Sequence, residues 1–266
     1  MVMSGQGEIN EVLWIALGCG LLAFARIVMV MIQAPIFGSK HYNSKVRIGI
    51  ATLLTLVAMP NLPIPAYFPT EPIGFILAIL TQLVVGLAIG FASFTVMAAA
   101  QFGGEMMDIQ MGLSVAASMD PSSGGASKLL MRLNFYIAML LYLVVDGHHQ
   151  LMIAIYKSFE VVPLTGFNVD GNLISHFVDV SGSIFVIGLQ IASPALAALF
   201  ITQVALGLLA RVAPQMNVFM LSFPLNIAVG LTMFSVGLPV IMTMLTKQFD
   251  ICLDDVFRTI GEITPK

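Results

Sequence analysis

Charged side chains are scarce in this chain, and cysteine is nearly absent. Only 9% of the 266 residues are charged, and 11 basic against 14 acidic groups give a net charge of −3. So few basic residues, spread so thinly, exclude both a nucleic-acid footprint and a polybasic lipid-binding patch. Cys19 and Cys252 lie far apart and in no metal-ligand spacing, which indicates neither a disulfide framework nor a zinc site.

The sequence also lacks the usual signatures of an enzyme. It has no Walker A lysine, which excludes nucleotide hydrolysis. His148 and His149 are adjacent and would point about 100° apart on a helix, so a structural or interfacial pair is favoured over a metal site. Ser122 and Ser123 lack the GxSxG elbow of a serine hydrolase. We therefore expect no catalytic residue, cofactor or metal, although an intramembrane hydrolase remains an alternative.

Apolar side chains are what the chain has in abundance. They make up 58% of the residues, and the mean hydropathy of +0.97 lies far outside the range of a soluble domain of this length. The sequence thus predicts an integral membrane protein. Its first residues carry Glu8 and Glu11 in place of a basic signal-peptide region, so we expect the first apolar segment to stay in the mature protein.

About six uncharged segments are candidate membrane spans, since crossing a hydrocarbon core of roughly 30 Å takes about 20 helical residues. They cover residues 12–36, 48–68, 73–100, 133–145, 180–210 and 212–246. Pro214, Pro224 and Pro239 should each kink or end a helix. Arg26 lies inside the first segment, where it either needs a partner or lies outside lipid. The expected fold class is an all-α polytopic membrane protein with Pro and Gly breaks.

The charges indicate an orientation only weakly. The segment Gly38–Arg47 holds Lys40, Lys45 and Arg47 without an acid, which favours the cytoplasmic side, whereas residues 60–72 have no Lys or Arg and favour the outside. We therefore expect the N-terminus outside. The mixed charges of the C-terminal tail do not decide its side.

Small residues line one face from the third apolar segment onward. Gly86 and Gly90 form a GxxxG that lets two helix backbones approach closely. Gly104, Asp108 and Gly112 follow at spacings of four, so that on a helix Asp108 projects from a face otherwise stripped of side chains. Two interpretations stay open for Asp108: a solvated acid at an interfacial helix end, or an acid held for a basic partner on another subunit.

A segment rich in glycine and serine follows this face. Asp120-Pro121 favours a turn, and residues 122–127 offer little that can pack. Methionines gather around the segment at Met106, Met107, Met111 and Met119. Because Met is unbranched and deformable, such a cluster could close around a gap that changes shape, or it could be ordinary packing in a membrane bundle.

Several motifs occur in a fixed order along nearly the whole chain. They are Arg26 with Pro35-Ile36-Phe37-Gly38, Val46-Arg47, the GxxxG with Phe91, GGEMMDIQMG, Asp120-Pro121, Gly147-His148-His149 with Ser158-Phe159, and residues 206–231. In this order they resemble the FliR family, whose injectisome relative is SctT. The most specific element is LARVAPQMNVF, Leu209–Phe219.

This resemblance implies a component of the type III protein export gate at the base of the bacterial flagellum, in the inner membrane. In that family a single FliR-type chain forms, with several copies of FliP and FliQ, the channel that passes unfolded flagellar subunits, and FlhB and membrane lipid are further expected partners. The resemblance also implies a FliP-like part, residues 1–176, and a FliQ-like helical hairpin, residues 177–266, within one membrane-embedded domain, residues 1–266. The gate would lie largely outside the bilayer plane.

The resemblance further implies roles for individual residues, with the region Gln110–Ser123 plugging the closed channel. The expected plug and gasket residues are Met106, Met107, Gln110, Met111, Gly112, Ser114, Met119, Asp120 and Pro121. The expected subunit contacts are Arg26, Gly86, Gly90, Gly104, Asp108, Arg211, Pro214, Asn217 and Phe219. The chain departs from the family at Gln82, where members often have an acid, and at Asn226, where they often have a lysine. A secondary transporter or channel acting alone is the alternative.

Overall fold

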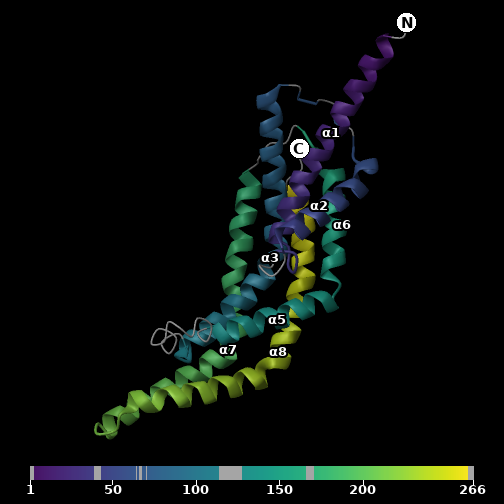
Figure 1. Cartoon of the computed structure of the whole chain (residues 1–266). Helices are drawn as coiled ribbons and strands as arrows, with labels where there is room; N and C mark the ends of the chain where they lie inside the picture. The colour runs from purple at the N-terminus through teal and green to yellow at the C-terminus, as the bar shows by residue number, and fades with distance from the viewer. Residues whose placement is uncertain are drawn as a thin grey trace. The chain divides into compact units, whose positions relative to one another are not determined.

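The computed structural model describes residues 3–38, 43–63, 65, 68–69, 71–113, 128–165 and 171–262. Within these ranges the chain is helical and contains no strand (Figure 1). The expected all-α class is therefore confirmed. The helices are α1 (Met3–Gln33), α2 (Ser44–Ala58), η1 (Met59–Asn61), α3 (Pro72–Gln110), α5 (Leu129–Val144), α6 (Gly147–Val161), α7 (Gly171–Val212) and α8 (Val218–Glu262).

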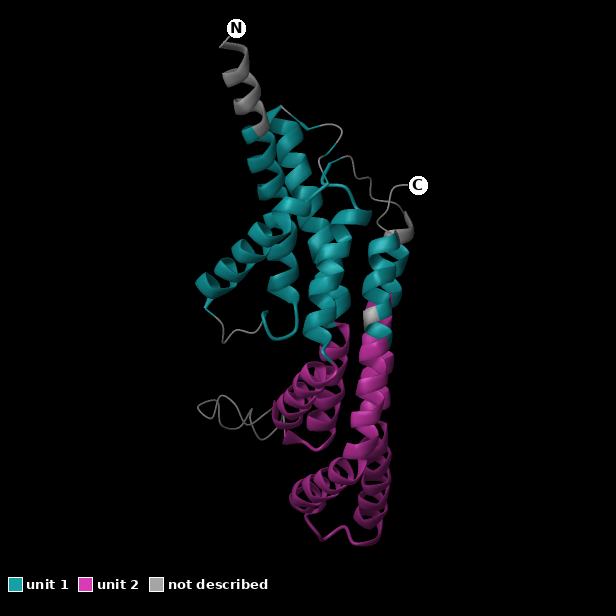
Figure 2. Cartoon of the chain, turned by 90° about the vertical axis from the view of Figure 1, so that its right-hand side faces the viewer, with its two compact units in different colours: residues 1–94, 146–179, 251–266 teal, residues 95–145, 180–250 magenta. Residues whose placement is uncertain are grey.

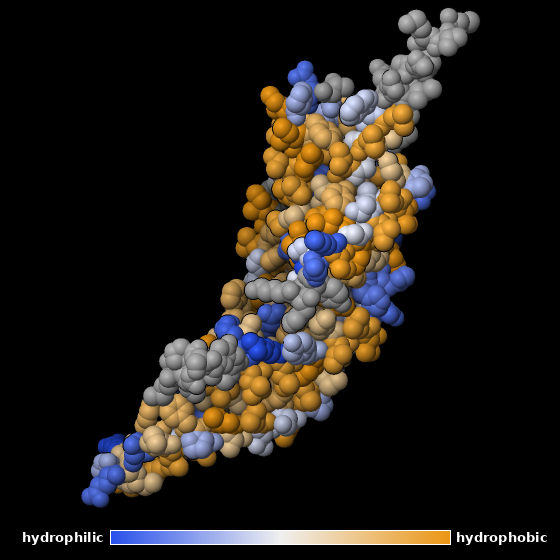
Figure 3. Space-filling model, in the orientation of Figure 1, coloured by the Kyte–Doolittle hydropathy of each residue, from blue (hydrophilic) through white to orange (hydrophobic). Residues whose placement is uncertain are grey.

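Four of the described helices are long and apolar enough to cross a membrane. Their spanning parts are Leu13–Gln33 in α1, Pro72–Gln110 in α3, Ile174–Val212 in α7 and Val218–Gly261 in α8. The bent pair α5 and α6 makes a fifth if the two helices count as one span. Apolar side chains accordingly cover most of the surface seen in Figure 3.

The expected span at residues 48–68 is wrong. Helix α2 ends at Ala58 and has 15 residues, which at 1.5 Å per residue is about 22 Å and shorter than a hydrocarbon core of roughly 30 Å. Pro60 stands at the start of the 3₁₀ helix η1 that follows. Pro60, Pro63 and Pro65 cannot continue a helix, so the helix ends before the apolar run of the sequence does.

The expected segment at residues 133–145 is part of a longer, broken unit. Helix α5 begins earlier, at Leu129, and is followed after Val144 by a second helix, α6. Asp146 separates them with a left-handed backbone, φ 54° and ψ 29°. A non-glycine residue adopts this conformation at some cost, so the chain changes direction here instead of extending one helix.

The prolines act differently from one position to the next. Pro214 lies in the break between α7 and α8, as expected, but Pro224 and Pro239 lie inside α8, and Pro194 lies inside α7. A proline removes the donor to the carbonyl four residues earlier. For Pro194 that carbonyl belongs to Gln190, and the Ser193 hydroxyl donates to it at 2.9 Å. A neighbouring side chain thus replaces the missing backbone donor.

Contacts divide the chain into two compact units (Figure 2). Unit 1 contains residues 1–94, 146–179 and 251–266, and unit 2 contains residues 95–145 and 180–250, so α3, α7 and α8 each contribute to both. This division by contacts does not test the expected boundary near residue 176, which was inferred from resemblance and not from compactness.

Unit 1 is built on close packing between α1 and α3. Gly86 lies against the backbone carbonyl of Arg26, and a Cβ at Gly90 would lie 3.3 Å from the Cα atom of Val30. The GxxxG therefore does bring two helix backbones together, and the partner is α1 of the same chain. Gly86 and Gly90 were expected at a contact with another subunit. In the structure they pack against α1 of the same chain.

We expect Gly86→Val to destabilise unit 1 by about 1–3 kcal/mol, because the added methyls would meet the Arg26 carbonyl and the Met29 side chain. Gly49 on α2 is the matched control, since a Cβ there meets nothing within 4 Å. The thermal denaturation midpoint of the chain in solubilised membranes should fall for Gly86→Val and stay unchanged for Gly49→Val. Equal midpoints for the two variants would show that α1 does not depend on this contact.

Candidate functional site

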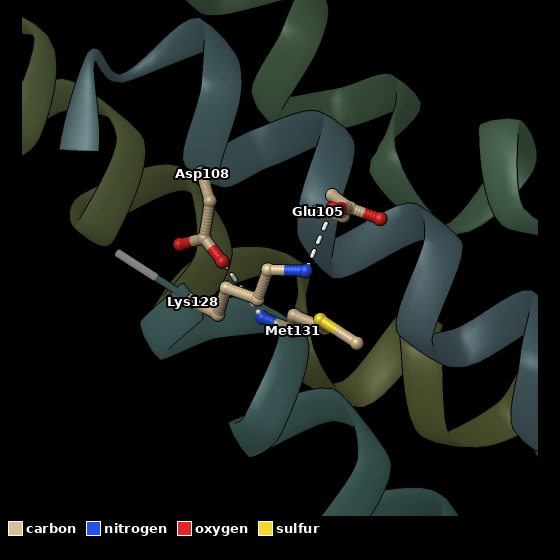
Figure 4. Close-up of polar contacts among 4 residues, drawn as sticks. All are labelled: Glu105, Asp108, Lys128 and Met131. Atoms are coloured by element: carbon tan, nitrogen blue, oxygen red, sulfur yellow. Dashed lines mark hydrogen bonds and ion pairs between the residues drawn. The ribbon is translucent and has the colours of Figure 1, made fainter. Parts of the chain in front are cut away.

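Asp108, near the end of α3, caps the N-terminus of α5 with its side chain. Its two carboxylate oxygens accept hydrogen bonds of 3.0 Å from the backbone N–H groups of Leu130 and Met131. Figure 4 shows the contact with Met131. The first N–H groups of a helix have no partner within the helix and carry its positive dipole end, so a carboxylate both satisfies and stabilises them. Lys128, in the N-cap position, supplies no side-chain hydrogen bond of its own.

The interpretation of Asp108 as a solvated acid is wrong, because the residue is only 1% exposed. Its oxygens are occupied by backbone groups of its own chain, an arrangement that neither interpretation anticipated. The role expected for it in a subunit contact stays a prediction. Spacing along a helix indicated which face the carboxylate shares, but not which helix end would meet it.

Glu105 is the partly exposed acid beside Asp108. Its Oε1 lies 3.2 Å from Nζ of Lys128, and the two side chains are 39% and 51% exposed (Figure 4). An ion pair this open to solvent contributes about 0–1 kcal/mol. It adds little to the attachment of α5 that the buried Asp108 provides.

Gly104 allows Asp108 to reach its partners. A Cβ on Gly104 would lie 2.6 Å from the carbonyl oxygen of Leu130 and from the backbone nitrogen of Met131, so α3 and α5 touch backbone to backbone. The expected face of small residues is thus a packed face within unit 2. Gly112 has φ +80°, a left-handed conformation that favours glycine, and a Cβ there would meet the Phe223 ring at 3.0 Å.

The methionines near the end of α3 are packed into unit 2. Met107 and Met111 are 1% and 0% exposed, and the Met111 side chain fills the space in front of Gly230 on α8. Met106 and Gln110 are half-buried. The other expected plug residues, Ser114, Met119, Asp120 and Pro121, lie outside the described residues. The plug itself stays a prediction.

Arg26 caps the C-terminus of α6 in unit 1. The residue is fully buried, and its guanidinium donates to the carbonyls of Ser158 and Val162 at 2.7 and 3.0 Å and to the side-chain oxygen of Gln82 at 2.7 Å. The last carbonyls of a helix lack partners and carry its negative dipole end, so a cation is favoured there. Arg26 therefore has the partners that its place in an apolar helix required.

Gln82 contributes a neutral amide to the hydrogen bonds of Arg26. Among the described residues, no carboxylate accepts from the guanidinium. The amide nitrogen of Gln82 in turn donates to the carbonyl of Leu164 at 3.0 Å. The ring of Phe159 lies 4.5 Å from the guanidinium carbon, which adds a cation–π contact. The charge of Arg26 is thus stabilised by backbone and amide dipoles and by an aromatic ring.

The turn between α7 and α8 is exposed, although it carries the most specific motif. Asn217 caps α8, since its side-chain oxygen accepts from the N–H of Met220 at 3.2 Å. Arg211 is exposed in the last turn of α7 and makes no hydrogen bond or ion pair with the described residues. Pro214 is exposed, and Phe219 is 63% exposed and packs edge-on against Phe223. These expected subunit contacts are on the surface.

Several contacts escaped sequence reasoning. Ser158 and Val162 were not singled out as partners of Arg26, because a backbone carbonyl leaves no signal in the side-chain sequence. His176 and Thr259, 2.8 Å apart through Nε2 and Oγ1, join the start of α7 to the end of α8 within unit 1 and were also missed. A buried histidine in an apolar helix could have suggested a polar partner, but not which one.

The geometry defines a polytopic helical membrane protein in which buried charges close the ends of helices. Comparison with known proteins identifies the kind of membrane protein: the model of bacterial export proteins, family 1, matches residues 17–251. Curated relatives named flagellar biosynthetic protein FliR are 32% identical in Bacillus subtilis, over 88% of this chain and 91% of that protein, and 30% identical in Escherichia coli K12, over 90% and 89%. The chain belongs to this family of flagellar export proteins.

We expect Asp108→Ala to lower stability by about 1–3 kcal/mol, because two buried N–H groups of α5 would lose their acceptor. Asp108→Asn should lose less, since one acceptor oxygen remains. Glu105→Gln is the control, and its partly exposed ion pair predicts a change within about 0.5 kcal/mol. Thermal denaturation of the chain in solubilised membranes measures all three, and an Asp108→Ala midpoint equal to that of Glu105→Gln would disprove the capping role.

Arg26→Lys should destabilise unit 1 by at least about 2 kcal/mol, because an ammonium cannot reach two carbonyls of α6 and the Gln82 amide together. Arg132→Lys, at an exposed position, is the control and should change nothing. Gln82→Glu, which sets a carboxylate against the guanidinium, should not destabilise. Steady-state amounts of chain in the membrane and its denaturation midpoint are the measurements, and wild-type values for Arg26→Lys would refute the need for a forked donor.

Proposed function

We propose that this chain forms, together with FliP and FliQ, the channel of the type III export gate that passes unfolded flagellar subunits across the inner membrane. The family match over residues 17–251 carries the proposal. The gate would serve flagellum assembly, with FlhB as a further contact. The role requires no bond chemistry by this chain, and the driving force comes from other parts of the apparatus.

The attachments around residues 114–127 support a plug in that channel. Residues 114–127 connect Leu113 to Lys128 in the sequence, and on either side of them Asp108 joins α3, which ends at Gln110, to α5, which begins at Leu129. The contact of Gly104 with Leu130 adds a second attachment. A segment whose ends are fixed together can be displaced without pulling α3 from α5, as repeated opening and closing would require.

The exposed apolar surface supports a chain that is covered by partners or lipid along much of its length. Large side chains of α7 and α8 that are more than half exposed include Phe185, Phe200, Ile201, Leu208, Met220 and Val236. Together with the exposed turn at Arg211, they fit a component that packs beside other helical subunits. FliP and FliQ are the proposed neighbours.

Two measurements test this function. The chain should copurify with FliP and FliQ after mild solubilisation, whereas a transporter acting alone would be isolated as a stable, active single chain. Deleting residues 114–118 should leave the amount of assembled gate unchanged and let small ions pass that the parent gate excludes. A deletion strain with an intact gate, unchanged conductance and normal export would show that the segment is a passive linker.

A further inference from the structure

Asn134 on α5 carries a buried side-chain amide. It is 0% exposed, and neither its side-chain oxygen nor its side-chain nitrogen has a hydrogen-bond partner among the described residues. It lies on the buried face of α5 together with Leu130, Ala138, Leu141 and Tyr142. In most structures a fully buried side-chain amide is paired, so this one is an exception that requires a physical explanation.

An unpaired amide in such a place makes the packing less stable than an apolar side chain of similar shape would. The amide gives up its hydrogen bonds to water when it is buried and gains none in return. Leucine branches at the same carbon and has no such loss. The closed packing of α5 in unit 2 is therefore weaker than its close contacts would indicate.

The contacts at the two ends of α5 are what keep Asn134 in place. At the start, Asp108 and Gly104 hold Leu130 and Met131 against α3. At the other end, the ring of Tyr142 packs on that of Phe249 from α8, with centroids 5.6 Å apart. Asn134 lies between these two attachments and is 0% exposed, so the amide can reach water only if the packing around this part of α5 opens.

We propose that Asn134 is a built-in destabilising group that keeps the closed packing of α5 marginal, so that α5, still joined to α3 at Leu130 and Met131, readily opens its packing around Asn134 when the channel opens. The amide gains hydrogen bonds in the open state, and this gain lowers the free energy of opening. The inference rests on the proposed function, because it takes the closed and open forms to be those of an export channel.

Asn134→Leu tests the energetic part of the proposal. The variant should raise the denaturation midpoint of the chain by about 2–4 °C, because it removes a buried unpaired amide without leaving a cavity. Asn226→Leu on α8 is the graded comparison: only its side-chain oxygen is buried without a partner, so its midpoint should change less. Gln82→Leu should lower the midpoint, because the Gln82 amide is fully used. Immunoblotting for the chain after heating solubilised membranes measures each denaturation midpoint, and it does not require the partner proteins to be known.

The functional part is tested by the export rate of a flagellar subunit in cells that hold equal amounts of each variant. Asn134→Leu should slow export by roughly fivefold or more, as expected when the closed form gains about one to two kcal/mol. Leu133→Met, at an exposed position in the same turn, should export normally. A lower midpoint for Asn134→Leu, or a higher midpoint with an unchanged export rate, overturns the inference. Normal export in a strain that lacks the whole chain would instead overturn the proposed function.

Discussion

The ends of the bent pair α5 and α6 must be satisfied inside an apolar protein, and two buried charges of opposite sign do this. Asp108, from α3, accepts from the first N–H groups of α5, and Arg26, from α1, donates to the last carbonyls of α6. Each charge matches the dipole of the helix end that it meets. An uncapped helix end would leave several buried polar groups without partners, at a cost comparable to the whole stability of a domain.

The glycines follow from this requirement. A charged side chain reaches a neighbouring helix only if the two backbones are close. Gly104 provides that approach for Asp108, and Gly86 brings α3 against α1, where Gln82 accepts from Arg26. The sequence placed Asp108 on the same face as Gly104, but it did not link Arg26 to Gly86. In the structure small residues and buried charges belong together, since one residue type creates the proximity that the other uses.

Sequence reasoning predicted the membrane class, the helical fold, the close face at Gly86 and the need of Arg26 for partners, because hydropathy, periodicity and charge each follow from the residues alone. It failed where the answer depends on the backbone of another segment. The carbonyls of Ser158 and Val162 and the N–H groups at the start of α5 have no side-chain signature. The span expected at residues 48–68 failed for a different reason. Apolar composition predicts that a segment avoids water, but crossing a membrane also requires an unbroken helix, and Pro60 interrupts this one.

Buried polar groups in this protein are of two kinds, and the difference indicates what each part must do. Arg26 and Asp108 each make several buried hydrogen bonds, so removing either one leaves buried groups without partners, and each contact is a permanent joint. The Asn134 amide has no hydrogen-bond partner among the residues that the structure describes, so it would gain free energy on reaching water. In the channel proposed above, tight closure and opening under load would require both kinds. The capped helix ends would keep the helices joined, and the packing around the Asn134 amide would be the first part to open.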